Sequence, residues 1–388
     1  MYINKLFSLR LFLIILLGIL PLEGIAKPFR IGVYANSTIP EALLKVVSGT
    51  YDVFSDNKKA FSVNDNALLY LNIRASQIVV SIDGSEVGRY NDLKFVSANP
   101  ENSLRIKPIQ TGLLERIFED NMEIRISPKG LFFINEVNLE SYVAGVLEGE
   151  IGMNQSKEFL KLQAIICRTY AISNIARHQQ QGFDLCDQVH CQVYYGKARL
   201  NLLIGLAVKE TEGKILLDSR KRPIVAAFHS NCGGMTYNSE DIWPTQVPYL
   251  RSVVDTFCKT SPHARWQQKI QKDKWTKYLE KYDSTGSLRH DSLNFTYNPV
   301  SKNSFYNYKT IKLPVKKVRN DWNFRSPSFI IEDRKDTLLF YGKGFGHGIG
   351  MCQEGAMRMA ELGYSYQDIV KYYYQDVFVS DLAEVQVY

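Results

Sequence analysis

Residues 135–196 constrain this chain more than any other stretch, because two amphipathic patterns there flank one glutamate and lead into a cysteine/histidine cluster. Apolar residues recur at helical spacing over 139–147 and again over 157–177. Both patterns begin directly after a residue type that caps helices well. The sequence therefore predicts two buried helices joined by a tight corner, with Glu150 on that corner.

Glu150 lies between Gly149 and Gly152. Glycine lets the backbone turn sharply and leaves space around a neighbouring side chain, so this carboxyl group can point into a cleft. The alternative interpretation is an ordinary solvated loop glutamate, which is the commoner situation for this residue type.

Three motifs occur in order along the chain: LESYVAGVLEGEIG with LKLQAIICRTYA, then FHSNCGGMT, then GKGFGHGIGMCQEGA. Together they resemble the SpoIID/LytB domain family, and three ordered motifs are far more specific than one short pattern. The resemblance implies a role in bacterial cell-wall remodelling. The best-understood family members are lytic transglycosylases that cut peptidoglycan, and others modify wall amidases. The residues matching the first motif are Leu139, Glu140, Tyr142, Gly145, Glu150, Gln163, Ala164, Arg168, Thr169 and Tyr170.

The resemblance places the catalytic acid at Glu150. A lytic transglycosylase needs only one carboxyl group: it protonates the glycosidic oxygen between MurNAc and GlcNAc, then accepts a proton from the muramic acid C6 hydroxyl as a 1,6-anhydro ring closes. This role requires a protonated carboxyl group near neutral pH, which partial burial favours. Glu148 is interpreted as a surface residue. The competing hypothesis is a wall-binding protein without chemistry of its own that stimulates or positions an N-acetylmuramoyl-L-alanine amidase.

The family motifs also predict the residues that contact substrate. His347 lies between glycines that permit close approach of a sugar, although it could equally be a structural residue that bonds loop carbonyls. His229 and Ser230 resemble a nucleophile pair but lack the glycine-x-serine-x-glycine elbow. No Lys-Ser/Thr follows the glycines, which excludes a phosphate-binding loop. The predicted substrate-binding residues are Arg168, Tyr170, His229, Ser230, Gly233, Gly234, His347 and Gln353.

A compact cluster of soft metal ligands follows the second helical pattern: His178, Cys186, His190 and Cys191. Two sulfur and two nitrogen donors fill a tetrahedral zinc sphere, so this zinc would be structural rather than catalytic. The alternative is a Cys186–Cys191 disulfide across the short loop.

Three further cysteines have separate predictions. Cys232 and Cys258 are expected to form a disulfide that closes the long, turn-rich segment between them, with two separate buried thiols as the alternative. Cys167 lies in the middle of the second helical pattern and is predicted to be a buried thiol.

The chain as a whole predicts an α+β protein. Residues 1–26 have a basic start, a short apolar run and a small-residue end, which is typical of a secretory signal peptide. Short alternating strands make 27–134 a β-rich region, and 135–388 is predicted to be a mixed α/β catalytic core. Within that core, 266–282 is predicted to be helical, 311–321 a strand and 355–374 a pair of helices.

The net charge of +7 is spread along 388 residues without a basic stripe, which argues against nucleic acid as a partner. The charge fits either mild attraction to anionic wall polymer or membrane surface, or simply good solubility. We therefore expect an exported protein of the periplasm or cell envelope. Its expected partners are peptidoglycan glycan strands and possible peripheral membrane contact, with a cell-wall amidase as a further candidate.

Overall fold

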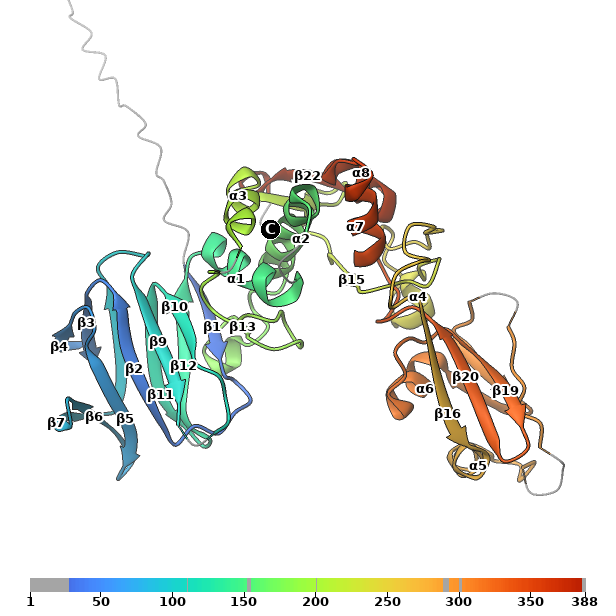
Figure 1. Ribbon diagram of the computed structural model, residues 1–388, viewed down its shortest axis with the longest axis horizontal. Helices are drawn as coiled ribbons and strands as arrows, with labels where there is room; N and C mark the ends of the chain where they lie inside the picture. Colours follow the sequence, from blue (N-terminus) through green and yellow to red (C-terminus); the bar gives the residue numbers. More distant parts are fainter. Residues whose placement is uncertain are drawn as a thin grey trace, which may run out of the picture.

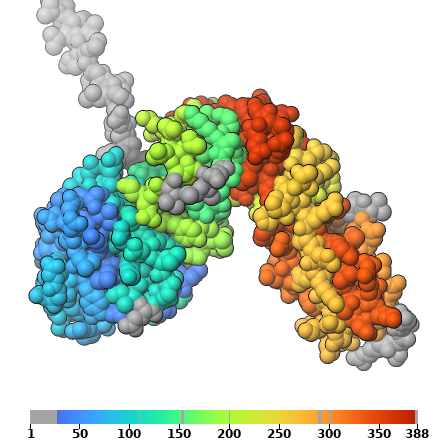
Figure 2. All heavy atoms as spheres, in the orientation of Figure 1, coloured from blue at the N-terminus to red at the C-terminus, as the bar shows by residue number. Residues whose placement is uncertain are grey.

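The computed structural model describes residues 28–109, 111–151, 155–199, 201–288, 293–299 and 302–385. The chain forms an arch with a β sandwich at one end, helices in the middle and a smaller lobe at the other end (Figure 1). Figure 2 shows the hollow beneath the helices, between the sandwich and the lobe. The predicted α+β class is confirmed. The predicted signal peptide, residues 1–26, lies outside the described residues.

The β sandwich consists of a seven-stranded and a six-stranded sheet. Alternating burial along strands such as β2 shows that each sheet turns one face into a shared core. The first sheet has the order β13 (Leu185–Cys186), β1 (Phe29–Val33), β12 (Gly130–Val137), β11 (Asn121–Ser127), β8 (Asp92–Ser97), β3 (Tyr51–Ser55) and β4 (Lys58–Val63). The second has the order β10 (Arg116–Glu119), β9 (Ser103–Pro108), β2 (Glu41–Ser48), β5 (Leu68–Arg74), β6 (Gln77–Ile82) and β7 (Ser85–Tyr90).

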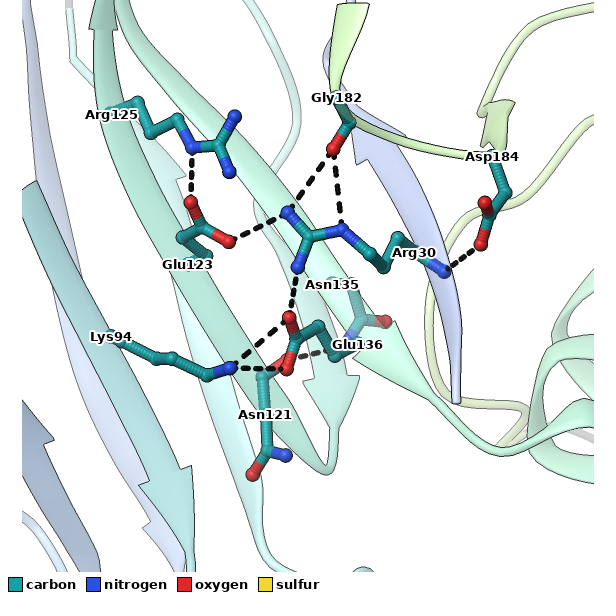
Figure 3. Close-up of polar contacts among 9 residues, drawn as sticks. All are labelled: Arg30, Lys94, Asn121, Glu123, Arg125, Asn135, Glu136, Gly182 and Asp184. Atoms are coloured by element: carbon teal, nitrogen blue, oxygen red, sulfur yellow. Dashed lines mark hydrogen bonds and ion pairs between the residues drawn. The ribbon is translucent and has the colours of Figure 1, made fainter. Parts of the chain in front are cut away.

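The sandwich and the following segment share a sheet. The boundary predicted at residue 134/135 falls inside β12, and β13, which comes much later in the chain, pairs in parallel with β1. Arg30 of β1 reinforces this connection (Figure 3). Its guanidinium pairs with Glu123 and Glu136 and donates to the Gly182 carbonyl, while its backbone N–H donates to Asp184. The loop that carries the cysteine/histidine cluster is thereby fixed to the sheet.

The central helices pack around α2 (Lys157–Ser173), which contacts α1 (Leu139–Ile151), α3 (Leu202–Glu210), α7 (Gln353–Glu361) and α8 (Tyr366–Tyr373). Ser156 caps α2, as predicted, by accepting a hydrogen bond from the Phe159 backbone N–H. Two short strand pairs complete this layer: β14 (Lys214–Leu217) with β22 (Phe378–Asp381), and β15 (Phe228–His229) in parallel with β21 (Met351–Cys352). The short helices α4 (Ser239–Ile242), η1 (Gln179–Gln181) and η2 (Leu382–Glu384) lie in the connections.

Residues 265–343 form the lobe at the other end of the arch (Figure 1). Its aromatic core centres on Trp275, which contacts Tyr278, Tyr306, Trp322 and Phe340. Its sheet has the order β16 (Arg265–Gln271), β20 (Thr337–Lys343) and β19 (Phe329–Arg334), and its other elements are α5 (Lys272–Glu280), the hairpin β17 (Phe305–Tyr308) and β18 (Ile311–Pro314), and α6 (Val315–Trp322).

Two sequence predictions for this lobe are wrong in part. Residues 266–282 begin as strand β16 before helix α5, and 311–321 begin as strand β18 before helix α6. The buried residues Trp266 and Ile270 are four positions apart, which places them on one face of a helix and also on one face of a strand. The predicted helix pair in 355–374 is confirmed by α7 and α8. No helix among the described residues is long and apolar enough to span a membrane.

Candidate functional site

Glu150 lies in the last turn of α1, so the prediction that it lies on a corner after the helix is wrong. The helix continues to Ile151, and glycine is required at position 149 because a Cβ atom there would meet the Val193 carbonyl oxygen at 2.9 Å. Glu150 Oε1 accepts a hydrogen bond of 2.9 Å from the Val193 backbone N–H. Burial raises the pKa of the Glu150 carboxyl group, and the Val193 hydrogen bond opposes that shift.

Glu148, the nearest carboxylate in sequence, has a different environment. Its Oε2 accepts a hydrogen bond of 2.8 Å from the Arg199 backbone N–H at an exposed position. Glu150, in contrast, is held by the Val193 N–H in a buried position that raises the pKa of its carboxyl group. The environments therefore favour Glu150 as a proton donor.

Arg168 does not reach a substrate-accessible surface. Its side chain is fully buried, pairs with both oxygens of Glu140 at 2.9 and 2.5 Å, and donates to the Lys214 carbonyl at 2.8 Å. This burial argues against the predicted substrate contact. The Arg168 side chain instead links α2 to α1 through Glu140 and to β14 through Lys214. Tyr170 is partly exposed, and its hydroxyl group lies 3.4 Å from the His190 carbonyl oxygen, beside the cysteine/histidine cluster.

His229 and His347 come from motifs more than a hundred residues apart, yet their ring centroids are 5.5 Å from one another. Ile349 organises both rings: its N–H donates to His347 Nδ1 at 3.0 Å, and its carbonyl lies 3.1 Å from His229 Nδ1. Burial lowers the pKa of both imidazoles, that of His347 to about 4, so both are neutral at pH 7. Trp243 packs against His347 with a centroid distance of 5.7 Å.

The hydrogen bonds fix the tautomers of the two histidines. His347 Nδ1 is an acceptor, which leaves its proton on Nε2, whereas His229 Nδ1 donates and leaves Nε2 as an acceptor. His229 Nε2 is buried and has no hydrogen-bond partner among the described residues. The pair thus leaves one imidazole nitrogen, His229 Nε2, as a buried acceptor without a partner in the described part of the chain.

The remaining predicted substrate-binding residues lie near this histidine pair. Ser230 follows β15, and its carbonyl accepts a hydrogen bond of 3.0 Å from Glu354 N at the start of α7. Gln353 is the first residue of α7. Gly233 and Gly234 both have positive φ, and a Cβ atom on Gly233 would meet the Lys343 backbone at 2.6 Å.

A cavity of about 660 Å³ opens beside the two glycines and extends along the lobe. Lys302 lines it and is largely buried, which lowers the pKa of its ammonium group to about 8. Its ammonium donates to the Met235 and Cys232 carbonyls. The other basic residues along the cavity are Lys259, Arg265 and Lys343. This cavity suits a ligand that carries anionic groups.

The predicted site residues therefore form two groups. Glu150 and Tyr170 lie on α1 and α2, and the histidine, serine, glycine and glutamine residues lie around β15 and β21. Within the described ranges, no hydrogen bond, ion pair or ring contact joins Glu150 to His229 or His347.

The four predicted zinc ligands do converge. One ligand atom from each of His178, Cys186, His190 and Cys191 lies within 4.8 Å of the others. Cys191 Sγ is 3.4 Å from His178 Nε2 and 3.7 Å from His190 Nδ1, and Cys186 Sγ is 3.8 Å from His190 Nδ1. Ligands at tetrahedral zinc are separated by about 3.3–3.8 Å, so these residues fit the ion. Cys186 and Cys191 are free thiols rather than a disulfide.

The other cysteines differ from the prediction. Cys232 and Cys258 are free thiols with sulfur atoms 3.4 Å apart, so the predicted disulfide is absent from this structure. Asp255 and Cys352 complete a second buried cluster of potential metal ligands around them. Sequence reasoning missed both residues, although Asp255 lies only three positions before Cys258. Cys167 is a buried thiol, as predicted.

Comparison with known proteins identifies the family. The sequence profile described as SpoIID, Stage II sporulation protein, matches residues 127–217. The chain is 34% identical over 272 residues to the Stage II sporulation protein D of Bacillus amyloliquefaciens, covering 64% of this chain and 76% of that protein. The chain belongs to the SpoIID family.

Two other relatives extend the comparison. An uncharacterized protein of Brachyspira hyodysenteriae is 32% identical over 272 residues, covering 66% of this chain and 70% of its own length. The Amidase enhancer of Bacillus subtilis is 29% identical over 345 residues, which is 70% of this chain but only 46% of that protein. The SpoIID family assignment predicted from the three motifs is thus confirmed. The relatives similar to this chain include proteins named Stage II sporulation protein D and a protein named Amidase enhancer.

Proposed function

We propose that this SpoIID family protein is a peptidoglycan lytic transglycosylase of the cell envelope, with Glu150 as its only general acid and base. The observation that carries this proposal is the environment of Glu150. Its carboxyl group has a pKa raised by burial, and a single backbone N–H holds one of its oxygens. A protonated carboxyl group can donate to the glycosidic oxygen as positive charge develops on the sugar.

The second half of the reaction uses the same residue. After proton donation, the Glu150 carboxylate accepts the proton of the MurNAc C6 hydroxyl as that oxygen attacks the anomeric carbon. The glycosidic bond breaks, the 1,6-anhydro bond forms, and no water is consumed. The Val193 N–H at 2.9 Å stabilises the carboxylate between the two proton transfers.

The second group of residues is proposed to bind the glycan and its acidic substituents. Trp243 offers an aromatic surface beside the partly exposed His347, and the buried His229 packs behind His347. The basic residues of the neighbouring cavity favour the carboxylates that peptidoglycan carries.

The products test this proposal. Purified peptidoglycan, with and without stem peptides, is incubated with the protein and analysed by mass spectrometry. We expect fragments that end in 1,6-anhydroMurNAc. Fragments with reducing MurNAc ends would indicate a hydrolase instead, and unchanged glycan strands would contradict the proposed chemistry.

A second function is favoured by the similarity to a protein named Amidase enhancer. In this case, the chain binds wall polymer and stimulates an N-acetylmuramoyl-L-alanine amidase without cutting the glycan. The same experiment separates the two functions when an amidase is added. Faster release of stem peptides without anhydro products would support stimulation alone.

We further propose that His178, Cys186, His190 and Cys191 hold one structural zinc ion, which supplies rigidity and no catalysis because its four ligands leave no open position. Val193, which donates to Glu150, follows Cys191 by two residues. Zinc would therefore hold in place the loop that contacts the catalytic carboxyl group.

Cys191→Ala is expected to lower the zinc content by about one ion per chain and the melting temperature by roughly 5 °C or more, because the metal stabilises only the folded state. Elemental analysis and thermal unfolding measure the two effects. Cys167→Ala, at a thiol outside both clusters, is the control for metal content. An unchanged zinc content, together with a Cys186–Cys191 bridge in peptide mapping, would contradict the zinc assignment.

A further inference from the structure

A second set of metal-ligand side chains converges beneath the histidine pair, away from the His178 cluster. Cys232 follows β15, Asp255 and Cys258 lie in the connection after α4, and Cys352 ends β21. One ligand atom from each of the four lies within 4.8 Å of the others. None of the four residues is more than 2% exposed. A carboxylate in a dry interior is costly unless a partner offsets its charge, and a metal ion is one such partner.

The interatomic distances suit tetrahedral coordination. Cys232 Sγ is 3.4 Å from Cys258 Sγ and 3.3 Å from Asp255 Oδ2. At tetrahedral zinc, with bonds of about 2.3 Å to sulfur and 2.0 Å to oxygen, these separations are about 3.8 and 3.5 Å. Movements of a few tenths of an ångström would place an ion between the ligands. A disulfide uses only two of the sulfur atoms and leaves Cys352 and Asp255 without a role.

We propose that Cys232, Asp255, Cys258 and Cys352 bind one zinc ion, in a site distinct from the His178 cluster. Thiolate sulfur favours zinc over magnesium or calcium, which take oxygen ligands. The four protein ligands fill the coordination sphere, so this ion is structural. The site goes beyond the proposed glycan chemistry and does not depend on it.

The groups around the four residues orient them for an ion. Tyr373 donates from its hydroxyl group to Asp255 Oδ2 at 2.9 Å, and the Phe257 backbone N–H donates to Oδ1 at 2.9 Å. Cys352 Sγ accepts from the backbone N–H groups of Cys232 at 3.3 Å and Gly355 at 3.4 Å. Such hydrogen bonds fix the direction of ligand atoms and stabilise thiolates, as expected around a bound metal.

The charge of the filled site is also compensated. Three thiolates and one carboxylate with a divalent ion leave a net charge of −2. Cys352 is the N-cap of α7, so the positive end of the helix dipole faces its sulfur. The buried ammonium of Lys302 bonds the Cys232 carbonyl oxygen at 3.1 Å. The helix N-terminus and the Lys302 ammonium both reduce the free-energy cost of burying the negative charge.

The proposed ion would brace the candidate glycan-binding residues. Cys352 pairs directly with His229 in the parallel ladder of β15 and β21. Cys232 lies two residues beyond Ser230, and Gln353 follows Cys352. The ion would therefore link the two motifs whose histidines face one another.

Zinc content tests the proposal directly. The full chain, purified without chelator under reducing conditions, is expected to hold two zinc ions, one for each cluster of ligands. Cys352→Ala and Asp255→Asn should each lose about one ion while the His178 cluster keeps its own, and Cys191→Ala should lose the other. Cys167→Ala is the matched control and should keep both ions.

Cobalt substitution supplies a second, spectroscopic readout of the same site. With cobalt in both clusters, five thiolates contribute to the sulfur-to-cobalt charge-transfer band, two from the first cluster and three from the second. Blocking the second site with Asp255→Asn or Cys352→Ala should remove roughly three fifths of that intensity. The proposal is overturned if Cys352→Ala and Asp255→Asn hold as much zinc as the parent chain, if peptide mapping finds Cys232 linked to Cys258, or if the site binds iron instead of zinc.

Discussion

Glu150→Gln is expected to lower the rate of anhydro-muropeptide release by about 10²–10⁴-fold, because the amide keeps the shape of the side chain but cannot transfer a proton. The Val193 N–H can still donate to the amide oxygen at this position, so the local fold should persist. The loss should therefore appear in kcat, with KM little changed. The measurement is the initial rate of product formation by mass spectrometry with purified glycan strands.

Glu148→Gln is the matched control, since it makes the same chemical change two residues away. We expect it to retain the parent rate, because Glu148 bonds a backbone N–H at an exposed position. If Glu150→Gln retained the parent rate, Glu150 would not be the acid.

The pH profile offers a second readout of the same residue. Burial raises the folded-state pKa of Glu150, so its proton, which the proposed reaction requires, is retained to higher pH than in an ordinary glutamate. We expect kcat/KM to fall as pH rises through this raised pKa. The contribution of Glu150 to the free energy of unfolding changes with pH in the same direction. It is fully present below the unfolded-state pKa of about 4.3, where the carboxyl group is neutral, and it is lost as pH rises through the folded-state pKa.

Arg168→Met is expected to reduce the free energy of unfolding by about 3 kcal/mol or more, because it leaves Glu140 without the guanidinium that both of its oxygens contact. The fully buried arginine also joins α2 to the carbonyl of Lys214. The midpoint and slope of urea unfolding, followed by circular dichroism, give the change.

Arg222→Met is the control for Arg168. It breaks the ion pair with Asp218, but the Arg222 side chain is 54% exposed, so the loss should stay below about 1 kcal/mol. A similar, small loss in both variants would show that the Arg168–Glu140 pair is not a main support of the helical layer.

Sequence patterns were sufficient wherever the deciding interactions are local. The apolar spacing and the cap at Ser156 predicted α2, and short alternating runs predicted the strands of the sandwich. The end of α1 was placed too early, since Gly149 and Glu150 belong to the helix and contact a chain segment more than forty residues away. The helix propensities of the residues near Gly149 do not reveal that contact.

The difference between local and long-range contacts also explains why the sequence predicted one metal-ligand cluster and not the other. His178, Cys186, His190 and Cys191 fall within fourteen consecutive positions, so their spacing alone suggested one site. Cys232 and Cys352 are 120 positions apart and meet only because β15 and β21 pair in parallel. A prediction from neighbouring residues could connect Cys232 with Cys258, but it could not supply Asp255 or Cys352 as further partners.

The lobe of residues 265–343 begins and ends at one place. Arg265 pairs with Lys343, and immediately before and after them Gly344 N donates to the Ala264 carbonyl at 2.9 Å. A short turn between Ala264 and Gly344 could replace the whole lobe without moving the ends of the remaining chain. The lobe thus leaves and rejoins the rest of the chain at adjacent residues, and Lys302 ties it a second time to the core through the Cys232 and Met235 carbonyls.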